Sequence, residues 1–166
     1  MTRQADETGQ RHVPPELAAR LISGQITLGE FTGLPRQTLY AIAEIGYQLL
    51  NSGKLAEAHD IYRGLVAADP YDSVFHCHLA ATLHRLGQLD AALDEYTKSL
   101  QFNKANMDAL VGRGEINLQQ QRLPEAIRDL RAAVELDPQG LKASTVRARA
   151  ILLALKEAAA QTNQAG

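Results

Sequence analysis

The sequence predicts an all-α protein: a solenoid of three helix-turn-helix repeats, with a helix before the repeats and a capping helix after them. Two observations carry this prediction. The 166-residue chain repeats itself with a period of 34, and it is rich in alanine and leucine while only 5% of its residues are aromatic. A fixed period of this length is the sequence signature of a repeat architecture.

The period is visible in five columns of equivalent residues. The columns are Gly53/Gly87/Gln121, Leu55/Leu89/Leu123, Ala58/Ala92/Ala126, Tyr62/Tyr96/Leu130 and Pro70/Lys104/Pro138. Small residues, a bulky side chain and a closing proline at these offsets indicate tetratricopeptide (TPR) repeats, in which two amphipathic helices are joined by a tight turn. We therefore expect repeats at 39–72, 73–106 and 107–140.

The turns inside the three repeats read NSGKL, RLGQL and QQQRL. Glycine suits the left-handed backbone position that follows a helix end. Gln121 takes this position in the third repeat, where a side chain costs some backbone strain. The alanine column is expected where two helices cross closely, because a larger side chain would push them apart.

The flanking segments complete a single domain at 14–160. Leu17, Leu21 and Ile22 form an apolar stripe at helical spacing, which predicts an N-terminal helix within 14–35 that ends in a glycine-rich link. A helix at 141–160 is expected to cap the open end of the stack. Residues 1–13 are too polar to fold and are expected to be a disordered tail, and 161–166 a second tail.

Composition limits the possible functions. The net charge is −2 with a pI near 6.2, so no basic surface for nucleic acid is expected. One cysteine cannot form an internal disulfide, which fits a reducing compartment. No apolar run approaches the roughly 20 residues that span a bilayer, and the N-terminus lacks a secretion signal. These observations predict a cytoplasmic protein without membrane insertion.

The stretch FHCHLAATLHRLG, residues 75–87, brings together Cys77, His76, His78 and His84. Ligands on one helix need a spacing of three or four to share a face, and no pair of these four has it. Cys77 and His84 share a face but lie about 10.5 Å apart along the axis, too far for one metal. We therefore expect no metal site. Cys77 and His84 should face the groove of the solenoid, and His76 and His78 neighbouring helices or solvent.

No enzyme is predicted, and no cofactor. Nucleophile-elbow, phosphate-loop and zinc-protease motifs are missing from the sequence. The segment from Gly112 to Gly114 falls inside a helix, where close packing explains it. The Asp and Glu residues are expected on solvent faces without pairing.

In a TPR stack the first helix of each unit lines a concave groove. Equivalent positions in the three units predict a mainly apolar peptide-binding groove with two tyrosines. The predicted groove residues are Tyr40, Ala43, Tyr47, Leu50, Val74, Cys77, Ala81, His84, Arg85, Val111, Glu115 and Leu118. Two alternatives stay open: Tyr40 and Tyr47 could pack on the N-terminal segment, and Glu115 with Asp108 could either orient a basic residue or simply be solvated. The positions hold too few Lys, Asn and Arg to clamp a peptide carboxylate.

The chain also resembles a known family, the TPR chaperones of type III secretion translocators (SycD/LcrH/IpgC). Three stretches carry the resemblance over about residues 17–160. They are LISGQITLGEFTGLPRQTLYAIAEIGYQLLNSGKLAEAHDIYRGL, DPYDSVFHCHLAATLHRLGQLDAALDEY and GRGEINLQQQRLPEAI. The N-terminal link and the YDS motif distinguish this pattern from a generic TPR.

The resemblance implies a non-enzymatic cytoplasmic chaperone that holds hydrophobic translocator proteins through an extended segment in the groove. It also implies a homodimer formed through the N-terminal segment, although this apolar stripe could instead fold back on the first repeat. The predicted interface residues are Leu17, Leu21, Ile22, Ile26, Leu28 and Phe31. The alternative function is a generic TPR scaffold in a bacterial secretion, pilus or regulatory assembly.

Overall fold

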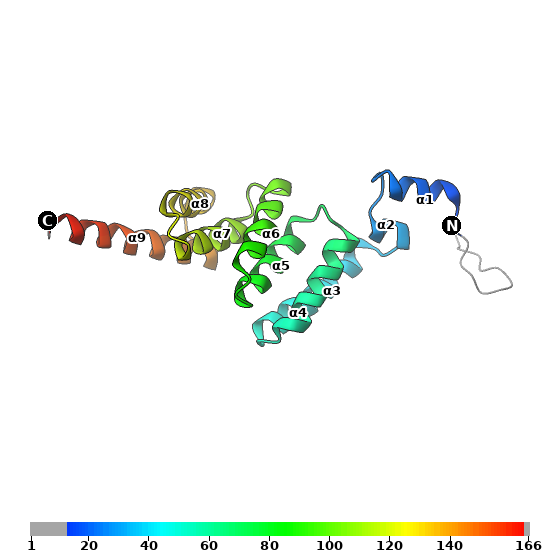
Figure 1. The fold of residues 1–166 in the computed structure, drawn as a ribbon, viewed down its shortest axis with the longest axis horizontal. Coiled ribbons are helices and arrows are strands. Elements are labelled where there is room, and N and C mark those ends of the chain that lie inside the picture. Colours follow the sequence, from blue (N-terminus) through cyan, green and yellow to red (C-terminus); the bar gives the residue numbers. More distant parts are fainter. Residues whose placement is uncertain (1–12, 165–166) are drawn as a thin grey trace.

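The structure, a computed structural model, describes residues 13–164, and these contain nine α-helices in an elongated stack (Figure 1). The helices are α1 (Pro15–Ile22), α2 (Leu28–Thr32), α3 (Arg36–Asn51), α4 (Leu55–Ala68), α5 (Ser73–Arg85), α6 (Leu89–Phe102), α7 (Met107–Gln119), α8 (Leu123–Leu136) and α9 (Ala143–Gln164). The all-α TPR prediction is confirmed. Three hairpins, α3–α4, α5–α6 and α7–α8, pack against one another in chain order.

The predicted columns have the expected structural roles. Ala58, Ala92 and Ala126 are fully buried where the two helices of each hairpin meet. Gln121 adopts a left-handed backbone with φ of 61°, beside 80° at Gly53 and 76° at Gly87 in the same column. All three repeats therefore have the same left-handed turn, and in the third repeat the Gln121 side chain strains it.

The helical glycines of the third repeat are packing positions. A Cβ atom at Gly112 would lie 2.3 Å from the Tyr96 ring and hydroxyl, and one at Gly114 would lie 3.0 Å from Leu130. Both separations are shorter than a van der Waals contact. The segment is therefore part of the core.

Both ends of the stack differ from the expected boundaries. The N-terminal segment 14–35 holds two short helices, because Gly24 turns the chain with φ of 71° and Thr27 starts a new helix through a capping box with Glu30. At the other end α9 begins at Ala143, since the Asp137 carboxylate accepts hydrogen bonds from the backbone N–H groups of 140–142 and holds them outside the helix. The helix then continues through residues expected to be a tail. The expected disordered tail, except Val13, lies outside the described residues.

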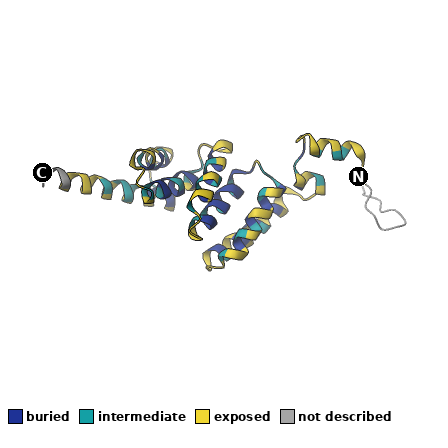
Figure 2. Cartoon of the chain, viewed as in Figure 1, coloured by how far each residue is buried: buried dark blue, intermediate teal, exposed yellow. Residues whose placement is uncertain are grey.

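The core lies between the hairpins and thins toward both ends of the stack (Figure 2). Its largest fully buried side chains are Tyr62, Phe75, Ile116 and Leu130. The sequence suggested that the acidic residues face solvent without pairing. This expectation is wrong for Asp129. Asp129 is buried and receives two hydrogen bonds from Arg113, at 2.7 and 2.9 Å.

Candidate peptide-binding face

The first helices of the three hairpins form one layer, with α5 lying between α3 and α7. Their outer side, called here the α3/α5/α7 face, is where the sequence placed the groove. Two tyrosines of α3 stand out on it: Tyr40 and Tyr47 are 39% and 44% exposed. The aromatic contacts of Tyr40 and Tyr47 are with Phe75 and His78 of α5, and not with the N-terminal segment.

Tyr40 is fixed at one end of this face. Its ring centroid lies 5.2 Å from that of Phe75, and its hydroxyl donates to the Asp72 carboxylate at 2.8 Å. Arg36 donates to the same carboxylate oxygen at 3.0 Å. Asp72 also caps α5 by accepting from the backbone N–H groups of the first turn. Burial alone would raise the pKa of Asp72, but these hydrogen bonds outweigh burial and hold the pKa below its ordinary value.

His78 is half-buried and faces neighbouring helices, as the sequence analysis expected. Its ring lies 5.7 Å from Tyr47 edge-on and stacks on Tyr62 at 5.1 Å. Burial lowers its pKa and favours the neutral ring.

Four of the twelve predicted groove residues lie beneath the surface. The exposed fractions of Ala43, Leu50, Cys77 and Val111 are 6% or less. Three of them, Ala43, Cys77 and Val111, occupy one repeat column and belong to the hydrophobic core. The expectation that Cys77 faces the groove is therefore wrong in this structure: burial raises the pKa of its thiol to about 12.

The remaining predicted positions lie on α5 and α7, and some of them are engaged with other groups of the protein. Glu115 accepts from Arg147 of α9 at 2.5 Å, so its carboxylate is neither free for a ligand nor simply solvated. Gln119 Nε2 lies 3.0 Å from His84 Nε2, and Arg85 donates to the Leu50 carbonyl. Val74, Ala81 and Leu118 are half-buried. Their role in binding a peptide stays a prediction.

The predicted dimer residues divide into two sets. Ile26 is buried, and Leu17, Leu21 and Phe31 are half-buried, while α2 docks on α4 with Gly29 against the Ala68 carbonyl. Ile22 is 86% exposed and Leu28 42%. Part of the stripe thus folds back on the first repeat, and part remains on the surface.

Within residues 13–164 no three or more His, Cys, Asp and Glu side chains gather as a metal would need. No helix in the same range is long and apolar enough to cross a membrane.

Two family models match the chain. A model described as bacterial transcriptional activator domain matches residues 15–102, just over half of the chain, and a tetratricopeptide repeat model matches residues 79–140. The two overlap on α5 and α6. Both therefore describe the helical hairpins of this fold.

Low calcium response locus protein H of Yersinia species matches along most of its length. Low calcium response locus protein H of Yersinia pestis is 28% identical over 137 residues, which are 81% of this chain and 82% of the relative. Human RNA polymerase II-associated protein 3 is 30% identical over 108 residues, but the chain spans only 16% of that protein. The second match is to the repeats within a much larger protein.

Solved structures agree with the first match. A type III secretion system complex from Aeromonas hydrophila has a TM-score of 0.74 and 27% identity, covering 87% of this chain and 97% of that one. The Yersinia enterocolitica translocator chaperone SycD, in complex with a peptide of the translocator YopD, has a TM-score of 0.66 and 28% identity over 74% of this chain and 95% of that one. SycD in an alternative dimer has a TM-score of 0.67, 28% identity and the same coverage.

Residues 15–102 thus belong to the bacterial transcriptional activator domain family, and the chain along most of its length belongs to the SycD/LcrH family of TPR chaperones of type III secretion.

Proposed function

We propose that this protein is a cytoplasmic chaperone of a type III secretion system, which binds hydrophobic translocator proteins and keeps them soluble and ready for secretion. The observation that carries the proposal is the pair of exposed rings of Tyr40 and Tyr47 on the α3/α5/α7 face, held by contacts with Phe75 and His78. It occurs in a chain whose relative SycD has been solved with a translocator peptide.

The face suits an extended peptide with apolar side chains. Tyr40 and Tyr47 offer large ring surfaces that neighbouring residues hold in place, so little side-chain entropy is lost on binding. The hydrogen bond from Tyr40 to Asp72 fixes one ring, and the edge contact with His78 supports the other. Apolar side chains of a client would bury against these rings, which is favourable by about 25 cal/mol per Å².

The protein acts on its client by binding, not by catalysis, and as a homodimer. The relative SycD is a translocator chaperone and has been solved as a dimer. In this chain the exposed Ile22 and Leu28 supply apolar surface for a second copy. Symmetric pairing of one patch is the commonest way in which such surfaces are covered.

The test uses the YopD peptide as a probe in fluorescence anisotropy. Tyr47→Ala should weaken binding about tenfold, because the ring is exposed and its loss removes contact area without opening the core. Tyr71→Ala is the matched control, since Tyr71 is 57% exposed but lies in the α4–α5 loop. Equal affinity of both variants and the wild type would place the binding site elsewhere.

A second candidate is a scaffold in a regulatory assembly, which the activator-domain match to residues 15–102 favours. Purification of the tagged protein from its own cells separates the two. A co-purified protein with long apolar stretches supports the chaperone. A soluble regulator or a pilus component in its place refutes it.

A further inference from the structure

In each repeat a second helix packs along the first, but α9, the last helix of the stack, has no such second helix among the described residues. In the hairpins α3–α4, α5–α6 and α7–α8 the second helix packs along the first. Helix α9 packs on α8 and α7, and within the described residues no helix folds back along it. At 1.5 Å per residue its 22 residues span about 33 Å against about 21 Å for the 14 of α8. It therefore runs past the rest of the stack (Figure 1).

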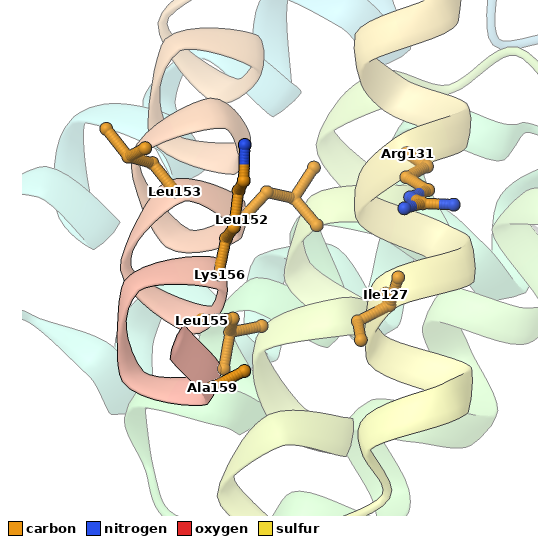
Figure 3. Close-up of a pocket in the computed structure, with 7 residues that line it drawn as sticks. All are labelled: Ile127, Arg131, Leu152, Leu153, Leu155, Lys156 and Ala159. Carbon is orange, nitrogen blue, oxygen red and sulfur yellow. The ribbon is translucent and has the colours of Figure 1, made fainter. Parts of the chain in front are cut away.

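An open groove of about 470 Å³ lies between α8 and α9. Its floor is apolar: Ile127 comes from α8, and Leu152, Leu155 and Ala159 come from α9. Figure 3 shows Leu152 pointing toward α8 while Leu153 points away. Leu153 is 56% exposed, so apolar surface continues onto the outer side of α9.

Positive charge borders this apolar floor. Arg131 of α8 and Lys156 of α9 line the groove, and both are exposed. Neither takes part in any ion pair of the described residues. A second groove of about 440 Å³ continues from Ile127 and Arg131 along α8, where Arg128 and Glu135 add one charge of each sign.

These features do not fit a helix that only closes the solenoid. A terminal cap needs a polar outer face, because it separates the core from water. Here the position that a second helix would take beside α9 is apolar at its centre and basic at its edges. That arrangement matches a helix with an apolar stripe bordered by acidic residues.

We propose that the groove between α8 and α9 binds an amphipathic helix of a partner protein, with acidic side chains beside its apolar stripe that pair with Arg131 and Lys156. A second copy of α9 is a poor occupant, because residues 143–161 carry Arg147, Arg149 and Lys156 against the single acidic residue Glu157. The inference is independent of the proposed function, since the groove uses α8 and α9 and the peptide face uses α3, α5 and α7.

The experiment measures binding of a synthetic amphipathic helix of about 18 residues, five turns long, with leucines on one face and glutamates beside them. Fluorescence anisotropy should give binding to the full chain that weakens as salt is raised. Ala159→Glu, which places a charge on the groove floor, and the double variant Arg131→Gln/Lys156→Gln should each weaken binding at least about tenfold.

Three controls make the result specific. Ala160→Glu adds the same charge on the same helix outside the groove, and Tyr47→Ala alters only the peptide face. Both should bind the probe as the wild type does. A probe with lysines in place of the glutamates should bind at least about tenfold more weakly. Circular dichroism checks that each variant remains helical.

Three outcomes overturn the proposal. One is no binding of the glutamate probe, and another is binding that Ala159→Glu leaves unchanged. The third is a loss of dimer in sedimentation equilibrium on Ala159→Glu, which would show that a second copy covers the groove. Because Tyr47→Ala is measured alongside, failure here is distinguishable from failure of the chaperone proposal.

Discussion

His76 Nδ1 lies 2.6 Å from Glu95 Oε2, and Nε2 of the same ring lies 2.9 Å from the carbonyl oxygen of Pro70. The Glu95 carboxylate and the peptide carbonyl both accept hydrogen bonds, so this arrangement favours the protonated imidazole, in which both ring nitrogens donate. His76 is buried and Glu95 is half-buried, with 4% and 13% of the two side chains exposed. It ties the loop between the first two repeats to α6.

The first prediction concerns pH. Burial alone would lower the pKa of His76, but the hydrogen bonds to Glu95 and Pro70 outweigh burial and raise it above 6.5. The stabilisation from His76 is therefore fully present below pH 6.5 and is lost as the pH rises through the raised pKa. His76→Gln should cost about 1–3 kcal/mol near pH 6 and less above pH 8, measured by urea unfolding. A cost that grows with pH would contradict the charged ring.

His78 provides the opposite case two residues away. Burial lowers its pKa below 6.5, so the folded protein loses stability as the pH falls from 6.5 through that pKa. NMR titration of the two rings, assigned with His76→Gln and His78→Gln, should show His76 titrating above 6.5 and His78 below it. If both rings titrated together near pH 6.5, the opposite pKa shifts of His76 and His78 would be refuted.

The second prediction is a packing test in the third repeat. Gly112→Ala should destabilise the protein by about 1–3 kcal/mol, because its Cβ would lie 2.3 Å from the Tyr96 ring. Gly64→Ala is the control, since nothing lies within 4 Å of its Cβ and alanine favours the helix by up to about 1 kcal/mol. Thermal unfolding should move the two midpoints in opposite directions. A neutral Gly112→Ala would mean that α6 and α7 can separate freely.

The third prediction concerns the strained turn at Gln121. Gln121→Gly should stabilise the protein by about 0.5–1 kcal/mol, because glycine adopts the φ of 61° without a Cβ clash. The reciprocal change Gly87→Gln in the same column should destabilise it by a similar amount. Urea unfolding of the two variants checks both signs, and loss of stability in both would show that the third turn has adapted to its side chain.

The sequence could predict those features that repeat with the chain. The period placed the hairpins, their turns and the alanine crossings, because each follows from residues at fixed spacing within one unit. Contacts between side chains of different helices, within one unit or beyond it, could not be predicted in this way. The pairing of Arg113 with Asp129, of Glu115 with Arg147, and of His76 with Glu95 depends on side chains from different helices. For the same reason the column of Cys77 was assigned to the surface, while packing in the hydrophobic core buries it.

The fourth prediction uses Cys77, the one cysteine of the sequence. Cys77 is 6% exposed, and burial raises the pKa of its thiol to about 12, which makes the reactive thiolate scarce at neutral pH. Alkylation by iodoacetamide should therefore be slow in the native protein and fast in urea. The control is Ser52→Cys in a Cys77→Ala background, where the thiol lies in an exposed turn and should react at the rate of a free cysteine. Equal reaction rates of Cys77 and Cys at position 52 in the native state would mean that the thiol lies open on the α3/α5/α7 face after all.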